Sequence, residues 1–394
     1  MNQATADFIR QHADADVHQL ALQGTKNPEV DLSLALNQIA GRQTARHKLP
    51  SWAAIDGIVY PSHLSMEQCS SEQTAQYKAN IIGSGKCLID LTGGFGVDFS
   101  YMARRFDEAI YVERQEQLCA IARGNFRLLG MEQAQVICCD STSYLHDMDA
   151  KDVIYIDPAR RDNLGGRTYA LSDCTPNVLE LRDMLLEKAD RVLLKLSPML
   201  DWRKAAGDIG EQHVREVHIV SAGNECKELL LLLGKGEGLK LVCVNDDTMF
   251  EVNRLQGTNV TNETYKTCGD FTPHQGTYIY EPNASIMKAG CFTELSQRYG
   301  ICQLAQNSHL FASDKLMADF PGRTFVADTI TPMNKHKLKV ALEGITQANI
   351  TVRNFPLSVA ELRKRLKLSE GGSTYIFATT LASRDKVLFI CRKA

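Results

Sequence analysis

The sequence predicts an α/β protein with a Rossmann-like, seven-stranded sheet, an N-terminal helical domain and a small C-terminal α+β region. Short, continuous apolar runs alternate with helical stretches between about residues 86 and 233, which is typical of a parallel sheet covered on both faces. The residues before this part have helix-like apolar spacing. Those after about residue 349 follow the order strand, helix, strand, strand.

The first predicted domain is helical and covers residues 1–82. Apolar side chains between Leu32 and Ile39 recur at helical spacing. A later helix is expected over residues 74–82, with a serine available as its cap and Gln73 near the capping-box position.

The second predicted domain covers residues 83–252 and contains the sheet. Five apolar strands are expected in succession, at residues 87–91, 108–113, 135–140, 152–157 and 191–196. Two more, at 214–220 and 228–233, are separated by only a short polar link. This spacing favours an antiparallel pair at the end of the sheet.

Two smaller segments are predicted after the sheet. Residues 253–330 are expected to form a small α+β, ferredoxin-like segment with a strand over 276–282. Residues 331–394 contain twelve Lys and Arg but four Asp and Glu, a net charge of +8 on a chain whose total is −3. A basic module on an acidic body indicates either a polyanionic partner or a well-solvated surface, and charge alone leaves both open.

The composition excludes disordered, collagen-like and low-complexity proteins for most of the chain. Hydrophobic residues make up 44% and charged residues 23% of the chain, as in ordinary globular proteins. No run approaches the ~18 apolar residues of a membrane span, and the first residues lack a secretory pattern. The 12 cysteines are scattered and form no C-x-x-C pair. We therefore expect a cytoplasmic protein without disulfides, a zinc knuckle or any other metal site.

A glycine-rich turn follows the first strand, in the run from Asp90 to Asp98. Gly93, Gly94 and Gly96 let the backbone approach a ligand closely, and the free N–H groups of the following helix point at it. Such a turn alone is weak evidence, because many turns merely connect a strand to a helix.

Three further acids end later strands and strengthen this prediction. Glu113 ends the second strand, where an acid binds ribose hydroxyls, and Asp140 ends the third, where it can meet an adenine amino group. Asp157 ends the fourth and begins the run Asp-Pro-Ala-Arg-Arg. The carboxyl ends of parallel strands meet at one edge of the sheet, so these acids are expected to form one ligand site.

The sheet and these motifs resemble the class I S-adenosylmethionine-dependent methyltransferases. Asp90, Gly94 and Gly96 match the family's first motif, and Thr92 replaces its first glycine, as it does in ribosomal-RNA guanine-N2 methyltransferases. The resemblance implies that Glu113 binds the cofactor ribose, Asp140 the adenine, and the glycines the methionine part. The full set of expected cofactor residues is Asp90, Thr92, Gly93, Gly94, Gly96, Asp98, Glu113, Arg114, Asp140, Ser141 and Asp157.

The whole chain is similar to a bacterial methyltransferase family with a C-terminal THUMP-like domain. Residues 70–78, the Asp157 run, residues 224–228 and the tail from 352 to 372 carry this resemblance. THUMP domains are RNA-binding modules, so the resemblance implies tRNA or rRNA as partner of the basic tail.

The acceptor side is predicted at Asp157, Pro158, Arg160 and Lys195. Asp157 would orient the N–H groups of a base. Uridine-C5 chemistry is disfavoured, because it needs a cysteine nucleophile at the end of the fifth strand, where this chain has Lys195-Leu196-Ser197-Pro198. Arg160 and Arg161 either meet a phosphate or form an ion pair. Lys195 either contacts substrate or is a buried partner of Asp157.

The favoured function is therefore an RNA base methyltransferase that acts on an exocyclic or ring nitrogen. A methyltransferase of a protein or small molecule is the main alternative, with the tail used for packing or oligomerisation. A cofactor-binding scaffold without turnover stays possible, and a nicotinamide dehydrogenase is disfavoured. The acceptor atom and the oligomeric state are not predicted.

Overall fold

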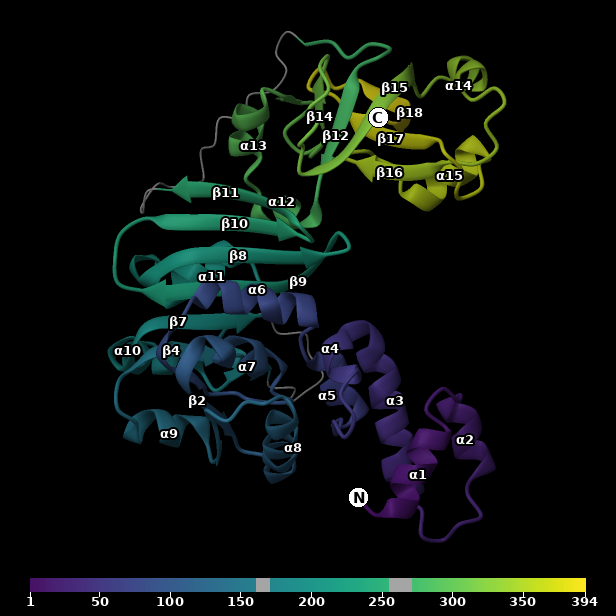
Figure 1. Cartoon of the computed structure of the whole chain (residues 1–394). Helices are drawn as coiled ribbons and strands as arrows, with labels where there is room; N and C mark the ends of the chain where they lie inside the picture. The colour runs from purple at the N-terminus through teal and green to yellow at the C-terminus, as the bar shows by residue number, and fades with distance from the viewer. Residues whose placement is uncertain (161–170, 255–270) are drawn as a thin grey trace. The chain divides into compact units, whose positions relative to one another are not determined.

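The computed structural model describes residues 1–160, 171–254 and 271–394 (Figure 1). The chain divides into two compact units, which are described separately below. The first comprises Met1–Glu216 with Leu229–Glu237, and the second Val217–Glu228 with Gly238–Ala394. No described helix is long and apolar enough to cross a membrane.

Helices make up the N-terminal part of the first unit. Four of them begin at a residue whose side chain accepts a hydrogen bond from the first turn, as N-caps do. The last of these is capped by Ser71, and Thr74 rather than Gln73 occupies the third helical position. The helices are α1 (Gln3–Gln11), α2 (Val17–Gln23), α3 (Leu32–Lys48), α4 (Pro50–Ala53), α5 (His63–Gln68) and α6 (Glu72–Ile82).

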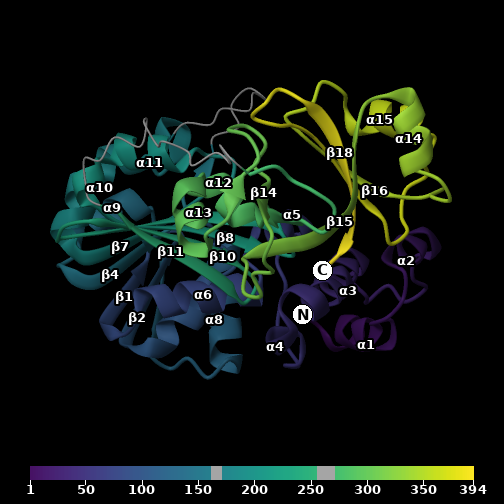
Figure 2. The same ribbon diagram turned by 90° about the horizontal axis from the view of Figure 1, so that it is seen from above.

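The sheet follows, with strands and helices alternating as expected. Five strands pair in parallel: β1 (Gly85–Asp90), β2 (Phe106–Glu113), β3 (Ala134–Cys138), β4 (Lys151–Ile156) and β7 (Ala189–Leu196). Between them come α7 (Val97–Met102), α8 (Glu116–Leu128), α9 (Ser141–Asp147) and α10 (Val178–Lys188), and α11 (Trp202–Ile209) follows β7. Helices α6 and α8 lie on one face of the sheet and α9, α10 and α11 on the other (Figure 2). The predicted α/β, Rossmann-like fold class is thus confirmed.

The sheet is longer than the predicted seven strands. Its order among the described residues is β11-β10-β8-β9-β7-β4-β1-β2-β3, with β8 (Val214–Ala222), β9 (Glu225–Gly234), β10 (Leu239–Asn245) and β11 (Thr248–Arg254). The two strands expected as an antiparallel pair, β8 and β9, are neighbours in the sheet, and β9 runs antiparallel to β7. The two additional strands form a hairpin whose turn has Asp246 at a positive φ of 51°. Leu241 and Cys243 are fully buried in it, so this hairpin, which belongs to the second unit, contributes to the hydrophobic core there.

The second unit contains a separate sheet of order β13-β14-β12-β15-β18-β17-β16. Its strands are β12 (Tyr278–Pro282), β13 (Cys302–Gln303), β14 (Phe311–Ser313), β15 (Gly322–Pro332), β16 (Asn349–Arg353), β17 (Tyr375–Thr380) and β18 (Lys386–Lys393). Its helices are α12 (Ala284–Ala289), α13 (Phe292–Tyr299), α14 (Lys335–Ala341) and α15 (Val359–Leu366). Strand β15 continues across the expected segment boundary at residue 330.

A buried carboxylate links three strands of this second sheet. Glu281 on β12 is 4% exposed, and its oxygens accept from Arg323 Nε on β15 at 2.9 Å and from Arg353 Nη2 on β16 at 3.1 Å. Two guanidinium groups therefore compensate one buried negative charge, which would be costly to bury alone.

Candidate active site

The glycine-rich turn connects β1 to α7 and has little room for side chains. Gly94 and Gly96 have φ angles of 57° and 83°, a region that residues with a Cβ rarely adopt. A Cβ on Gly93 would lie 2.2 Å from the ring of Tyr111. Glycine is therefore required at these positions by backbone conformation or by close packing.

Glu113 lies beside this turn at the end of β2. Its Oε2 accepts from the Gly94 N–H at 3.0 Å and its Oε1 from the Gln115 N–H at 2.8 Å. The Tyr111 hydroxyl donates to the Gly94 carbonyl from the same strand. Glu113 is half-buried, whereas Arg114 points into solvent. The structure thus brings the second-strand acid and the glycine turn together.

Asp140 follows β3 and begins α9. Its Oδ1 accepts from the N–H groups of Thr142 at 3.0 Å and Ser143 at 3.1 Å, so it is the N-cap of that helix. Its side chain is exposed, and Ser141 is the first helical residue. The cap fixes the direction of the carboxylate at the end of the third strand.

Asp90 and Thr92 connect the glycine turn to the fourth strand. Asp90 is 1% exposed and accepts from the Thr92 N–H at 2.9 Å. Burial raises the pKa of Asp90 well above its usual range. The Thr92 hydroxyl in turn accepts from the Asp157 N–H at 2.6 Å. The threonine that replaces the family's first glycine thereby joins the two loops.

Asp157 and Lys195 meet at the carboxyl ends of β4 and β7. The register pairs Ile156 with Leu194, so the next residue of each strand comes side by side. Lys195 Nζ lies 2.7 Å from Asp157 Oδ2. Burial raises the pKa of Asp157, and the ammonium of Lys195 offsets part of this rise. Of the two interpretations of Lys195, the structure shows the partner of Asp157.

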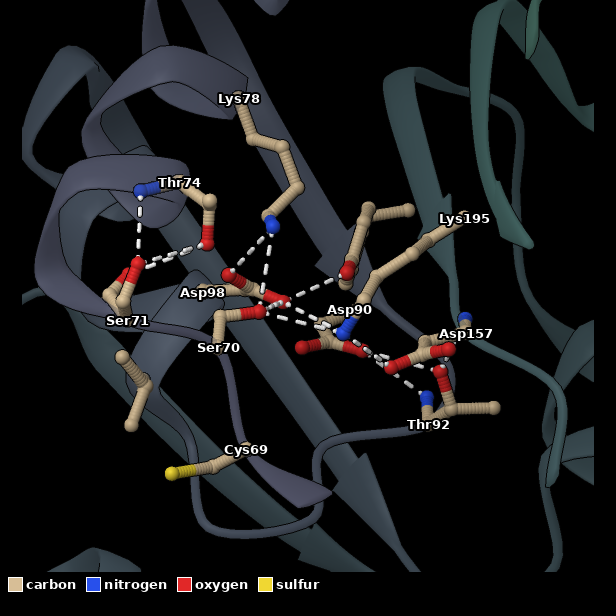
Figure 3. A network of polar contacts seen from close by, with 12 residues as sticks. Cys69, Ser70, Ser71, Thr74, Lys78, Asp90, Thr92, Asp98, Asp157 and Lys195 are labelled. Atoms are coloured by element: carbon tan, nitrogen blue, oxygen red, sulfur yellow. Dashed lines mark hydrogen bonds and ion pairs between the residues drawn. The ribbon is translucent and has the colours of Figure 1, made fainter. Parts of the chain in front are cut away.

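Asp98 is the centre of a network of polar contacts in the first turn of α7 (Figure 3). Its Oδ2 accepts from Ser70 Oγ at 2.8 Å and from the Tyr155 hydroxyl at 2.7 Å. Lys78 Nζ lies 3.1 Å from its Oδ1 and Lys195 Nζ 3.5 Å from its Oδ2. Burial alone would raise the pKa of Asp98, but the two lysines and the hydroxyl donors outweigh it and lower the pKa to about 2.

The remaining acceptor-side residues lie in the loop after β4. Pro158 is buried. The backbone of Arg160 belongs to the short strand β5 (Ala159–Arg160), which pairs with β6 (Cys174–Thr175). Arg161 lies outside the described residues, so the predicted phosphate contact or ion pair of the two arginines stays a prediction.

Ser70 and Lys78 were not among the predicted site residues, although their segment carried the family resemblance. Lys78 is fully buried on α6. It shares a helix face with Ala75, Ala79 and Ile82, which are also buried. A lysine at the i, i+3, i+4, i+7 spacing of an apolar stripe is a signal that the sequence contained.

The N-terminal helical segment also packs against the glycine turn through aromatic side chains. Trp52 is fully buried, and its ring packs edge-on against Phe95 with centroids 5.0 Å apart.

Asn125 on α8 exchanges two hydrogen bonds of 2.9 Å with the backbone of Val59. Trp202 is buried in α11 under the guanidinium of Arg203.

Comparisons with known proteins agree with this geometry. A family model for a ferredoxin-like domain matches residues 278–321, and one for a THUMP-like domain matches residues 322–393. The crystal structure of a "putative methyltransferase" from Porphyromonas gingivalis W83 is 34% identical, with a TM-score of 0.86, over 99% of this chain and 98% of that chain.

Two curated relatives come from Mycobacterium tuberculosis strains CDC 1551 / Oshkosh and ATCC 25618 / H37Rv. Each is described as an uncharacterized S-adenosylmethionine-dependent methyltransferase. Each is 24% identical over 335 residues, which is 83% of this chain and 87% of the relative.

Proposed function

The chain belongs to the S-adenosylmethionine-dependent methyltransferases that carry a C-terminal THUMP-like domain, and we propose that it methylates a nitrogen atom of an RNA base. The enzyme class and the cofactor follow from the relatives. The proposal concerns the acceptor, which we place in tRNA or rRNA.

The residues at the glycine turn fit the cofactor. Gly94 and Gly96 have positive φ angles that a residue with a Cβ would strain, and Glu113 offers a half-buried carboxylate to the two ribose hydroxyls. We assign the adenine amino group to the exposed Asp140 at the end of β3. When bound, the cofactor supplies a methyl group on an electrophilic sulfonium.

The ion pair of Asp157 with Lys195 is the observation that carries the acceptor chemistry. A carboxylate at this sheet edge can accept the N–H of a base amino or ring nitrogen and take up the proton that the methylated nitrogen releases. Asp157 is partly buried, which disfavours its charge, and the ammonium at 2.7 Å favours the ionised form. The pair therefore holds the Asp157 carboxyl group in a fixed orientation, and the ammonium of Lys195 favours its ionised form.

Uridine-C5 methylation stays disfavoured at this site. Among the described residues around the network, Cys69 is the cysteine drawn beside it (Figure 3). Its Sγ donates to the Met66 carbonyl at 3.2 Å, and burial raises its pKa. A protonated, backbone-bonded thiol is a poor nucleophile.

The C-terminal segment supports an RNA partner. Ten of its twelve cationic side chains are exposed: Lys335, Lys337, Lys339, Lys364, Arg365, Lys367, Arg384, Lys386, Arg392 and Lys393. Exposed cations can contact the phosphates of a nucleic acid, and each such contact releases counterions. A THUMP-like domain of this charge favours RNA over a protein or a small molecule as acceptor.

Methyl transfer from tritium-labelled S-adenosylmethionine into total RNA tests the proposal. RNA from a strain deleted for this gene is the substrate, and the Asp157→Ala protein is the control. Label in a discrete RNA with the wild-type protein alone is expected, and nucleoside analysis then identifies the base. Absence of label from an enzyme that binds the cofactor would overturn the RNA assignment and favour a protein or small-molecule acceptor.

A further inference from the structure

We propose that Ser70 and Lys78, which precede the sheet, are positioning residues of the acceptor site: Lys78 neutralises most of the charge of Asp98, so that Lys195 pairs mainly with Asp157. This inference rests on the proposed role of Asp157. It gives the N-terminal helical segment a part in the proposed chemistry.

Charges of opposite sign alternate through the network. Lys78 faces Asp98 at 3.1 Å, Asp98 faces Lys195 at 3.5 Å, and Lys195 faces Asp157 at 2.7 Å. Two ammonium groups thus match two carboxylates. Lys195 is the shared member, and it lies closer to Asp157 than to Asp98 by 0.8 Å.

Lys78 determines how Lys195 is shared. Asp98 is at the more buried end of the network, and its side chain is 10% exposed against 38% for that of Asp157. A buried carboxylate without a counter-ion is costly, so it recruits the nearest cation. Without Lys78, Lys195 would be that cation, and Asp157 would lose part of the attraction of Lys195 in addition to the smaller direct attraction of Lys78.

Ser70 holds the two lysines at fixed positions. Its hydroxyl donates to Asp98 Oδ2 at 2.8 Å and accepts from both Lys78 Nζ and Lys195 Nζ at 3.1 Å. The hydroxyl therefore contacts three of the four charged groups. Its loss would remove one acceptor from Lys195 and one donor from Asp98, and both changes move Lys195 towards Asp98.

Other titratable groups also face this network. From β1, Asp90 lies near both Asp98 and Asp157, and burial raises its pKa. From the coil before α6, Cys69 lies near Lys195 and Asp98, and burial raises its pKa. Tyr155 on β4 donates to Asp98. These groups stay unchanged in the variants below, so differences between variants report on Lys78 and Ser70.

The titration of Asp157 provides a test that needs no acceptor. The protein is labelled with carboxyl carbon-13 in its aspartates, and the Asp157 signal is assigned by its loss in Asp157→Asn. In Lys78→Met the titration midpoint of Asp157 is expected to rise by about 0.5–1 pH unit. Ser70→Ala is expected to raise it in the same direction by a smaller amount.

A double variant separates positioning from packing. Lys78→Met with Asp98→Asn removes both charges of the buried pair, so Lys195 is again left to Asp157. The midpoint is then expected to return to within ~0.3 unit of the wild-type value. Lys86→Met, which removes an exposed lysine from β1, is the control and should leave the midpoint unchanged.

The outcomes are distinct. An unchanged midpoint in a folded Lys78→Met protein overturns the inference, and so does a shift that persists in the double variant. If Lys78→Met does not fold, the midpoint of Asp157 in Ser70→Ala decides instead: a rise supports the inference, and an unchanged midpoint overturns it. Failure to label any RNA would affect the proposed function but not this titration, so the two can fail independently.

Discussion

Replacing Lys195 by methionine should separate acceptor chemistry from cofactor binding. The side chain keeps an unbranched apolar stem, and it loses the ammonium that lies 2.7 Å from Asp157 and 3.5 Å from Asp98. Lys195 contacts Asp157, Asp98 and Ser70, whereas the glycine turn and Glu113 make contacts of their own. The rate of methyl transfer is therefore expected to fall while cofactor affinity stays nearly constant.

The magnitude follows from the loss of one close charge. An opposite charge at this range lowers a carboxyl pKa by about 1–3 units. The Asp157 side chain is 38% exposed, so water screens part of this effect and we expect a rise of about 1 unit. On the acidic limb of the pH profile this rise lowers the ionised fraction by up to about tenfold, and loss of a fixed orientation adds about tenfold more, for about 100-fold in kcat there, or ~2.7 kcal/mol.

The pH dependence of kcat shows in which direction the pKa of Asp157 changes. In the proposed function Asp157 acts as a carboxylate, so activity is expected to disappear as the pH falls through its pKa. Lys195→Met raises that pKa, and the acidic limb of the kcat profile should move to higher pH. Lys195→Arg retains the charge and should keep the limb near its wild-type position.

Methyl-transfer assays over a pH series and calorimetric titration with S-adenosylmethionine check both parts. A limb that stays in place in Lys195→Met would refute the reasoning. So would a Kd for the cofactor that rises by the same factor as kcat falls, because Lys195 would then belong to the cofactor site.

Three further predictions concern other parts of the chain. Glu113→Ala should raise the Kd for S-adenosylmethionine about 10–100-fold by calorimetry, through lost hydrogen bonds to the ribose; an unchanged Kd would remove Glu113 from the cofactor site. Gly93→Val should lower the free energy of unfolding by ~2–4 kcal/mol in urea, because its Cβ would lie 2.2 Å from the Tyr111 ring; a loss below ~1 kcal/mol would contradict the close packing. Replacing exposed Lys364 and Arg365 on α15 by Glu should weaken RNA binding more than 10-fold and flatten its salt dependence; an unaltered salt slope in filter binding would place the RNA elsewhere.

The strand-end acids could be predicted from the sequence because the register of parallel strands brings their carboxyl ends together. Parallel strands of similar length present their carboxyl ends at one edge, so Glu113 and Asp157 were placed from a one-dimensional pattern. The meeting of Asp157 with Lys195 needed the register of β4 against β7, which pairs Ile156 with Leu194. Sequence spacing alone left that contact as one of two alternatives.

The network around Asp98 was harder to predict. Its members come from the coil before α6, from α6, α7, β4 and β7, and no short motif contains them. Asp98 was expected among the cofactor residues, and the structure encloses it between Lys78 and Lys195. The buried lysine on an apolar helix face was the available signal. The hairpin of β10 and β11 was missed because a short apolar run beyond the expected seven strands has no distinct periodicity.

The pairing of β15 with β12 joins the two C-terminal segments, and this has a consequence for how such enzymes evolve. The ferredoxin-like match ends at residue 321 and the THUMP-like match begins at 322, yet β12 of one pairs with β15 of the other over five residue pairs. Glu281 of the first also binds Arg323 and Arg353 of the second. A gene that gained only one of the two segments would expose an open sheet edge and an uncompensated buried charge. Recombination is therefore expected to preserve them as a single cassette.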